Sequence, residues 1–568
     1  MKKLLTPIKS RIPQILAIIM LLLIQVYCDL TLPQYTANIV DIGIQNTDFQ
    51  YIINTGEIML LMVAISAFAT VGVSYFSSRV SSGYAKDLRK IVYRKVLKFS
   101  NHELNEISRS SLITRSTNDI NQLQSVLGMI FTTMLFAPLL GIGGIIKAFE
   151  LGTDLSWIIA ITFTTVIVLL LIILVRVLPY FKITQEIIDK INKTSREILI
   201  GMPVIKAFVR QDFEEAKFQK VNQDFLDVNL FVYRNIMIMI PLMILILNLM
   251  TVLILYFGAY DALSGGILTG DIIAFIQYST QIVTSFLMIG GFLIILPRIL
   301  VSGRRVSEVL NTEITITDGD ITTINDNPTI EFRNVEYKYP GSEKETLKNI
   351  SFSLKPGKTT AIIGGTGSGK TTILNLIPRL QDPTAGEILI DNKNIKNFNL
   401  KTLRDKISFT PQKAILFQGT VRSNMQTGKS DATDTEIKNA LKLAQVDFID
   451  TLDEEVAQGG SNFSGGQKQR LSIARAIIGK HDFYLFDDCF SALDMNTERK
   501  VKDNLLKLKD SSILIVSQRI STIMDADEII VLDNGEIVDR GDHFQLTETC
   551  DIYREIVNTQ IDSMEVQL

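Results

Sequence analysis

The chain has 568 residues, 47% of them hydrophobic, and its mean hydropathy of +0.25 excludes an ordinary soluble protein. The formal net charge is −3, so no overall basicity indicates a nucleic-acid partner. The three cysteines, Cys28, Cys489 and Cys550, have neither paired nor metal-type spacing, which argues against a disulfide framework or a zinc cluster.

The long apolar runs lie in the first 310 residues. Because a membrane helix needs about 20 apolar residues, we interpret six of these runs as membrane spans. The last run is longer than a bilayer needs, so we expect it to extend into the cytoplasm. We therefore predict an all-α transmembrane domain over residues 1–310, with six helices that include 13–32, 57–78, 126–149, 157–179, 236–261 and 272–302.

The distribution of Lys and Arg predicts the orientation of these spans, because cytoplasmic segments are enriched in both. Neither occurs between Ile12 and Ser78 or between Asn235 and Pro297, whereas 79–118 and 182–234 are rich in them. We predict a multi-pass protein of the plasma membrane with both termini in the cytoplasm. The two basic segments have helical periodicity, so we expect long cytoplasmic extensions that turn near 104–113 and 210–218 and contact the soluble domain.

After a linker at 311–328, residues 329–568 are typical of a cytoplasmic α/β domain with a phosphate-binding loop. The motif Gly364-x4-Gly369-Lys370-Thr371 follows an apolar strand at 360–363 and precedes a helix. Glycines allow backbone N–H groups to approach phosphate oxygens. The lysine of such a loop contacts the β- and γ-phosphates, and the hydroxyl residue ligates Mg²⁺. The apolar segment "FYLFDD" places Asp487 at the end of a strand, where a carboxylate also holds Mg²⁺.

Between these motifs lies "NFSGGQKQRLSIARAI", in which Ser464-Gly465-Gly466-Gln467 opens a basic amphipathic helix. With this segment the sequence resembles the ATP-binding cassette (ABC) family along nearly the whole chain. The resemblance implies two nucleotide domains packed head to tail, with ATP between the phosphate loop of one and the signature of the other. Six spans fused to one nucleotide domain resemble the exporter branch, and imply the ABC type I exporter fold.

The resemblance also implies roles for single residues. Tyr339 would stack on adenine, although a structural tyrosine is the alternative, and Gln412 would contact Mg²⁺ and the attacking water. The expected metal ligands are Thr371, Gln412 and Asp487, and the expected catalytic positions are Asp488, Gln518 and Gln412. The residues expected to bind ATP are Tyr339, Gly364, Gly365, Thr366, Gly367, Ser368, Gly369, Lys370, Thr371, Thr372, Ser464, Gly465, Gly466 and Gln467.

Two positions depart from the pattern of family members that hydrolyse ATP well. Asp488 stands where a glutamate polarises water, and the shorter side chain withdraws the carboxylate by about 1.5 Å, at a cost on the order of a hundredfold in rate. Gln518 stands where a histidine contacts the γ-phosphate, and an amide carries no charge and shuttles no proton. We expect this site to bind MgATP well and to cleave it slowly.

An impaired site beside an intact signature predicts a non-identical ABC half-transporter as partner, one that has Glu and His in its own site. The predicted function is ATP-driven export of hydrophobic or amphipathic compounds, as in multidrug export. We expect a hydrophobic small-molecule cargo, contact with membrane lipids and no nucleic acid. The alternatives are a peptide or lipid exporter or flippase with a narrow cargo, and a homodimer that acts as a slow ATP-gated regulator.

Overall fold

The computed structural model describes residues 2–151, 155–263, 265–508 and 510–565. The chain forms two compact units, Met1–Leu97 with Arg109–Thr312, and Lys98–Ser108 with Glu313–Leu568. The sequence had assigned all of 1–310 to the membrane domain. In the structure, the short segment 98–108 instead packs with the second unit.

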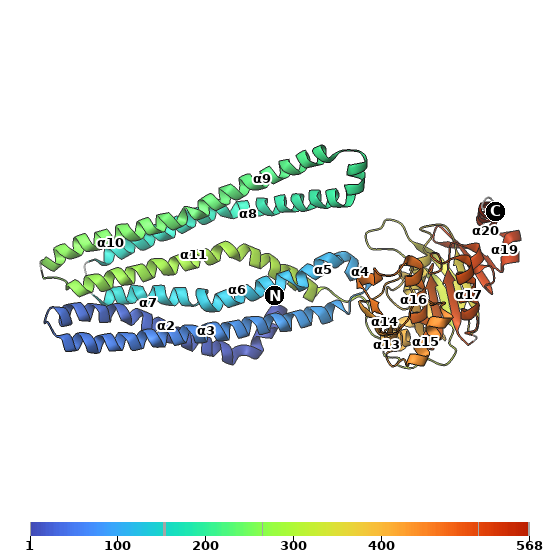
Figure 1. The fold of residues 1–568 in the computed structure, drawn as a ribbon, viewed down its shortest axis with the longest axis horizontal. Helices are drawn as coiled ribbons and strands as arrows, with labels where there is room; N and C mark the ends of the chain where they lie inside the picture. The colour runs from blue at the N-terminus through green and yellow to red at the C-terminus, as the bar shows by residue number, and fades with distance from the viewer. Residues whose placement is uncertain (1, 152–154, 264, 509, 566–568) are drawn as a thin grey trace. The chain divides into compact units, whose positions relative to one another are not determined.

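The first unit consists of long helices (Figure 1). Among the described residues, six helical stretches are long and apolar enough to cross a membrane, which confirms the predicted six-helix domain. The first five predicted spans lie within these stretches, and the sixth, 272–302, extends beyond the apolar stretch that ends at Phe292 but stays within its helix, Thr269–Asn311. The helices are α1 (Lys2–Leu5), α2 (Ile12–Asn38), α3 (Phe49–Val96), α5 (Arg109–Ser116), α6 (Asn118–Met129), α7 (Phe136–Glu150), α8 (Ser156–Ala207), α9 (Gln211–Met237), α10 (Met239–Leu263) and α11 (Thr269–Asn311), with the short turns η1 (Thr6–Arg11), η2 (Ile39–Ile44) and η3 (Ile130–Met134).

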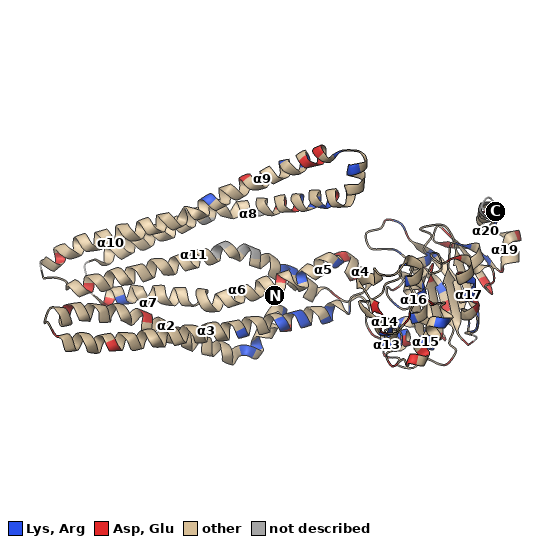
Figure 2. Ribbon diagram, in the orientation of Figure 1, with Lys and Arg blue, Asp and Glu red and all other residues tan. Residues whose placement is uncertain are grey.

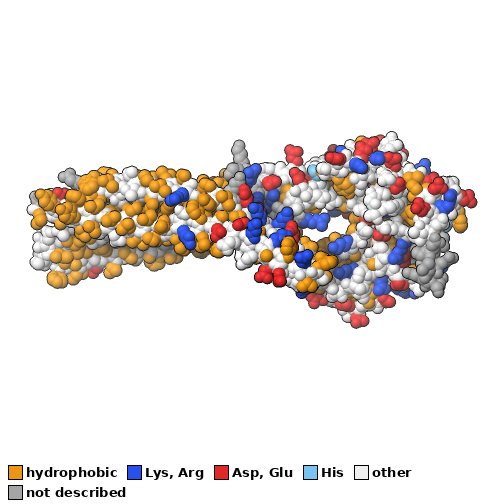
Figure 3. Space-filling model, turned by 90° about the horizontal axis from the view of Figure 1, so that it is seen from above, with side chains coloured by type: hydrophobic (Ala, Val, Ile, Leu, Met, Phe, Trp, Pro, Cys, Tyr) orange, Lys and Arg blue, Asp and Glu red, His pale blue; other side chains and the backbone are white. Residues whose placement is uncertain are grey.

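Composition explains these helices. They carry few charged residues along most of their length, and Lys and Arg gather toward one end of α3 (Figure 2). Hydrophobic side chains are spread over the face of the helical unit that Figure 3 shows. Large apolar side chains such as Leu60, Phe68 and Leu263 are exposed, as expected of a surface that lipid covers.

The turn between α8 and α9 lies earlier than predicted. The backbone reverses at Phe208–Arg210, and Val209 has a positive φ of 50°. The predicted range 210–218 instead belongs largely to the first turns of α9, because "RQDFEEAKF" continues the helical pattern after the reversal. The predicted turn near 104–113 contains the break at Ser108, which has a φ of 65°.

The second unit is an α/β domain with two main sheets. An antiparallel sheet has the order β2-β1-β4-β5, and a largely parallel sheet has the order β12-β11-β3-β10-β9-β6. The strands are β1 (Ile330–Tyr337), β2 (Leu347–Leu354), β3 (Thr359–Ile363), β4 (Ala385–Ile390), β5 (Lys393–Asn394), β6 (Ile407–Thr410), β7 (Gly419–Thr420), β8 (Glu455–Val456), β9 (Phe483–Asp487), β10 (Ser512–Val516), β11 (Glu528–Asp533) and β12 (Glu536–Gly541).

The second unit also contains helices. They are α4 (Asn101–Ile107), α12 (Lys370–Leu376), α13 (Leu400–Asp405), α14 (Val421–Gln426), α15 (Asp434–Leu443), α16 (Gly465–Ile477), α17 (Met495–Leu505), α18 (Ile520–Ile523), α19 (His543–Thr549) and α20 (Asp551–Glu565), with the 3-10 turns η4 (Ile395–Asn397) and η5 (Gln458–Gly460). Together with the helical unit, this architecture confirms the predicted fold class of a six-helix transmembrane domain followed by an α/β nucleotide-binding domain.

Strands β3, β9 and β10 position the candidate site. They are parallel neighbours with β10 in the middle, and every residue of the three strands is buried. Such strands are apolar on both faces, as "TTAII" and "SILIV" largely are. Because parallel strands end at the same edge, the segments after Ile363, Asp487 and Val516 meet there.

Within the second unit, Glu103 fixes helix α4 to the segment that begins at Glu313. The Glu103 carboxylate accepts hydrogen bonds from the backbone N–H and hydroxyl of Ser100 and from those of Thr315, the latter at 2.9 and 2.7 Å. The Asn101 N–H also donates to the carbonyl of Leu380 at 3.4 Å. Burial alone would raise the pKa of Glu103, but these hydrogen bonds outweigh it and lower the pKa to about 2.

Candidate functional site

A cavity of about 350 Å³ lies at the carboxyl edge of the parallel sheet. Its lining comes from the segment between β1 and β2, the loop after β3, the first turn of α12, the segment after β6, and the ends of β9 and β10. Most of the residues predicted around this chain's own phosphate loop line the cavity. The lining residues are Tyr339, Thr346, Thr366, Gly367, Gly369, Lys370, Thr371, Thr372, Gln412, Asp487, Asp488, Val516 and Gln518.

The loop Gly364–Gly369 has the backbone that a phosphate cradle requires. Gly369 has a φ of 101°, and a Cβ on Gly364 would lie 2.0 Å from the carbonyl oxygen of Leu532, so neither position accepts a side chain without strain. Gly364, Gly365 and Ser368 belong to the same loop but do not line the cavity. The glycines thus keep the backbone N–H groups close to the space where phosphates would bind.

Lys370 closes the loop on itself. Its ammonium group donates to the carbonyls of Gly364 at 2.8 Å and Gly365 at 2.7 Å, and to the Ser368 hydroxyl at 3.3 Å. Burial lowers the pKa of Lys370, and the nearby carboxylates of Asp488 and Asp487 oppose this shift. A triphosphate would supply the negative charge that this buried cation lacks.

Thr371 and Asp487 form a pair suited to a divalent cation. The Thr371 hydroxyl donates to Asp487 Oδ1 at 3.1 Å. Burial raises the pKa of Asp487 to about 6, although the hydrogen bond from Thr371 lowers it. A buried carboxylate beside a hydroxyl is the oxygen donor set that Mg²⁺ prefers, and these two residues would hold it.

Asp488 and Gln412 lie against each other at the cavity. Gln412 Nε2 donates to Asp488 Oδ2 at 3.3 Å. The Asp488 backbone has a φ of 44°, and its N–H donates to the carbonyl of Val516 at 2.9 Å. Burial raises the pKa of Asp488, while the hydrogen bond from Gln412 and the charge of Arg519 lower it. This geometry leaves the short carboxylate engaged by an amide.

Gln518 lines the cavity with an exposed side chain, and a residue that sequence reasoning missed holds its backbone. Gln560 on α20 donates from Nε2 to the Gln518 carbonyl at 2.7 Å and accepts from the N–H of Ile520 at 2.9 Å. One amide thus fixes both sides of the loop that carries Gln518. No motif marks Gln560, so only the folded chain reveals this contact.

Tyr339 lines the cavity, and the residue is about one-third exposed. Its hydroxyl is 3.1 Å from the Thr372 hydroxyl, and its ring meets that of Tyr337 edge to face at 4.9 Å. These contacts leave part of the ring free to stack on a planar group, as predicted for adenine.

The signature residues do not line this cavity. Ser464 caps α16 through a capping box with Gln467, and Ser464 and Gly465 are exposed. Gly466 packs against the chain beyond β9, since a Cβ there would lie 2.9 Å from the Ala492 carbonyl oxygen. The first turn of α16 is therefore a capped and exposed helix N-terminus that does not take part in the cavity at the chain's own phosphate loop.

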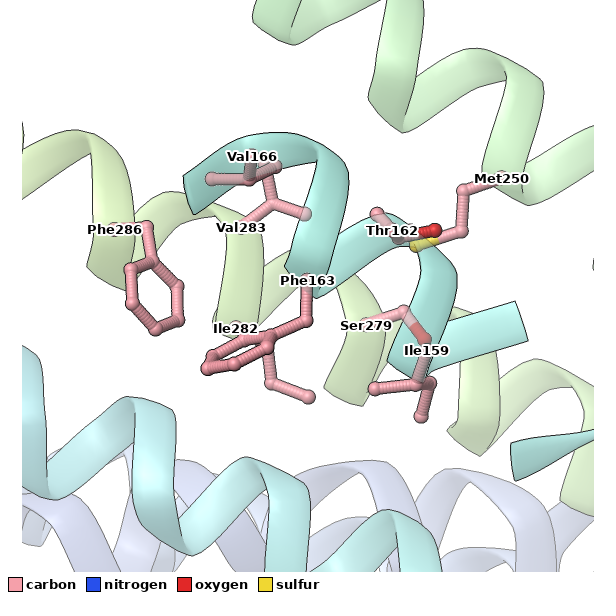
Figure 4. A pocket seen from close by; sticks show the side chains of 9 residues that line it. All are labelled: Ile159, Thr162, Phe163, Val166, Met250, Ser279, Ile282, Val283 and Phe286. Atoms are coloured by element: carbon pink, nitrogen blue, oxygen red, sulfur yellow. The ribbon is translucent and has the colours of Figure 1, made fainter. Parts of the chain in front are cut away.

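One enclosed cavity in the helical unit is much smaller, at about 10 Å³ (Figure 4). It lies among residues of α8, α10 and α11, including Phe163, Met250 and Phe286. The hydroxyl of Ser279, which also lines it, is buried and has no hydrogen-bond partner among the described residues. The space suits about one water molecule and is too small for a cargo molecule.

Comparisons with known proteins agree with this geometry. The family "ABC transporter transmembrane region" matches residues 15–286, and the family "ABC transporter" matches residues 347–491. An uncharacterized ABC transporter ATP-binding protein of Mycobacterium tuberculosis (strain CDC 1551 / Oshkosh) is 36% identical, over 96% of this chain and 95% of its own length. The uncharacterized ABC transporter ATP-binding protein YfiB of Bacillus subtilis (strain 168) is also 36% identical, over 95% of both chains.

A solved structure supports the same architecture. The structure of a bacterial Atm1-family ABC exporter with ATP bound superposes with a TM-score of 0.81 and covers 96% of this chain and 98% of its own, at 23% identity. In this family the nucleotide domain binds ATP and, in general, couples its hydrolysis to transport. The chain is therefore a multi-pass membrane protein of the ABC transporter family, with one transmembrane region and one nucleotide-binding domain in the same chain.

Proposed function

We propose that this chain is the subunit with the impaired ATP site in a heterodimeric exporter of hydrophobic or amphipathic compounds. The observation that carries this proposal is that Asp488 and Gln518 both line the cavity that contains the phosphate loop. Lys370, Thr371 and Asp487 retain the groups that bind phosphate and Mg²⁺. The two groups expected to act on the scissile phosphate are a short carboxylate and a neutral amide. The site should therefore bind MgATP but hydrolyse it slowly.

The partner would complete two unequal sites. This chain's Ser464–Gln467, exposed at the start of α16, would face the partner's phosphate loop. The partner's site would contain the glutamate and histidine that are absent here. Its hydrolysis would reopen the closed dimer, while the nucleotide in the Asp488 site stays bound for longer.

The helical unit would carry the cargo across the plasma membrane, with both termini and the second unit in the cytoplasm. Helix α4, fixed by Glu103 to the nucleotide unit, and the turn at Phe208–Arg210 would pass the motion of the nucleotide domains to the membrane helices. Spans 236–261 and 272–302 contain no Lys or Arg except Arg298, which argues against a strongly anionic cargo.

Steady-state ATPase of the purified pair tests this function. We expect Asp488→Asn to lower turnover by less than about threefold, because the carboxylate contributes little at this site. Removing the partner's glutamate by a Glu-to-Gln change should abolish turnover. An equal loss from both changes contradicts the asymmetric assignment, and brisk ATPase by this chain purified alone supports a homodimer instead.

A further inference from the structure

Three membrane helices converge on a polar turn around Asp29. Asp29 lies on α2, Ser66 on α3 and Gln281 on α11. At 1.5 Å per residue, they lie about 18–26 Å along their helices from Ile44, Phe49 and Thr269, where η2 ends and α3 and α11 begin. Because the hydrocarbon core is about 30 Å thick, this places the three side chains in the membrane interior.

Direct hydrogen bonds join the three helices at this turn. The Ser66 hydroxyl donates to Asp29 Oδ1 at 2.7 Å, and Gln281 Nε2 donates to the backbone carbonyl of Asp29 at 2.9 Å. That carbonyl is free because Pro33, four residues later, has no N–H to donate within the helix. α11 thus supplies the donor that α2 lacks.

Asp29 does not face the side of α2 that lipid would cover. At about 100° per residue, the exposed apolar side chains Leu16, Met20, Leu23 and Tyr27 cluster on the side of α2 opposite to Asp29. Gln25 and Thr36 share the side of Asp29. A polar stripe in a membrane helix is placed toward the protein or a water-filled space, since lipid solvates it poorly.

The cluster of Asp29, Ser66 and Gln281 has more hydrogen-bond acceptors than donors. Within the described ranges, no Lys or Arg pairs with Asp29, and its Oδ2 accepts no hydrogen bond. Gln281 Oε1 is buried and also has no donor in the described part of the chain. The sequence supplies no Lys or Arg from Ile12 to Ser78 or from Asn235 to Pro297. An ionised carboxylate at this depth is costly unless a cation or several donors accompany it.

We infer that Asp29, Ser66 and Gln281 form a binding site for an organic cation, and that the site recognises the protonated amine of amphipathic cargo. The ammonium group satisfies Asp29 Oδ2 by charge, and its N–H groups supply the donor that Gln281 Oε1 lacks. The apolar body of the cargo lies among the apolar side chains of the bundle. This inference rests on the proposed export function for its cargo, but not on the heterodimer.

A matched pair of fluorescent probes tests the site. Dansylcadaverine carries a protonated primary amine, and its N-acetyl derivative is neutral and almost the same shape. We expect the transporter, purified with its co-expressed partner in lipid nanodiscs, to bind the amine at least about tenfold more tightly than the neutral compound. Asp29→Asn should remove this preference without weakening binding of the neutral probe.

Glu57→Gln is the control, because Glu57 is an exposed carboxylate on α3 and its loss removes the same charge. It should leave the preference unchanged. Equal amine binding by the wild type and Asp29→Asn overturns the inference, as does a wild type with no preference. If Asp29→Asn lowers the yield of assembled transporter, Asp29→Glu must restore both the yield and the preference for the amine probe. If Asp29→Glu restores only the yield, the carboxylate serves assembly and the inference is overturned.

Transport of the same probes separates this inference from the export proposal. In inverted vesicles, we expect both probes to be taken up in an ATP-dependent way, with the amine preferred by the wild type but not by Asp29→Asn. That result supports both the cation site and the export proposal. Equal uptake of both probes by wild type and Asp29→Asn supports export and overturns the site. Selective binding of the amine without ATP-dependent uptake of either probe supports the site and contradicts export.

Discussion

The ATP cavity and the first turn of α16 show how one domain can separate binding from chemistry. In the cavity, the groups that hold phosphate and Mg²⁺ are present, while Asp488 and Gln518 replace the groups that drive cleavage. At α16, Ser464, Gly465 and Gln467 form a complete and exposed helix start. In the proposed heterodimer, the difference means that this chain supplies an intact signature to the partner's site, while its own site has only a short carboxylate and a neutral amide where cleavage would occur.

The largest expected effect comes from the signature. Ser464→Ala removes the helix cap and a hydroxyl at the partner's nucleotide, so we expect the ATPase rate of the pair to fall by at least about tenfold. Ser461→Ala, an exposed serine just upstream, is the control. The equivalent change in the partner's signature should lower the ATPase rate less than Ser464→Ala does. A larger loss from the partner's change would contradict the proposed difference between the two ATP sites.

Restoring the missing groups should give the next largest effect. Asp488→Glu with Gln518→His supplies the longer carboxylate and the ionisable ring, and we expect cleavage at this site to accelerate on the order of tenfold or more. Single-turnover hydrolysis, with the partner's glutamate removed, isolates this site. No acceleration would mean that other features of the cavity limit its chemistry.

The Glu103 clamp should affect stability and coupling. Its pKa of about 2 lies below the ordinary 4.5, so its stabilisation is present above pH 4.5 and is lost as the pH falls toward 2. Glu103→Gln should lower the free energy of unfolding by about 1–3 kcal/mol and raise the ATP consumed per cargo molecule. Glu106→Gln, an exposed neighbour on α4, is the control. Unchanged coupling would limit Glu103 to a structural role.

The contribution of Asp487 to stability should depend on pH in the opposite direction from that of Glu103. Because burial raises its pKa from 3.8 to about 6, its favourable contribution is present below pH 3.8 and is lost as the pH rises through 6. Asp487→Asn should therefore stabilise the nucleotide-free transporter by about 1–2 kcal/mol at pH 7.5. Thermal unfolding with and without MgATP measures this, and the variant should lose the stabilisation by MgATP. A less stable apo variant would contradict the assignment.

The smallest effect is expected from Gln560→Ala. Loss of its two hydrogen bonds to the Gln518 loop should weaken ATP binding at this site by about twofold to fivefold. Thr559→Ala, on the same helix, is the control. Titration with a fluorescent ATP analogue measures the change. A fivefold loss in both variants would indicate general damage to α20.

Sequence patterns predicted the features that depend on neighbouring residues. Apolar runs predicted the spans, and the glycine loop and the strand that ends at Asp487 predicted two walls of the cavity. Contacts between distant segments were not predictable in this way. The amide of Gln560, the attachment of Glu103 to Thr315, and the donation from Gln281 to Asp29 each depend on the packing of segments that no local periodicity relates.

The attachment of α4 to the nucleotide unit bears on how this protein should be divided for experiments. A fragment that begins at residue 313 would contain the sheets and the phosphate loop but would leave the N–H and hydroxyl of Thr315 without their carboxylate acceptor. Such a fragment exposes a surface that the intact chain covers. Fusing residues 98–108 to its N-terminus through a flexible spacer should give a better-behaved soluble domain for crystallisation or calorimetry.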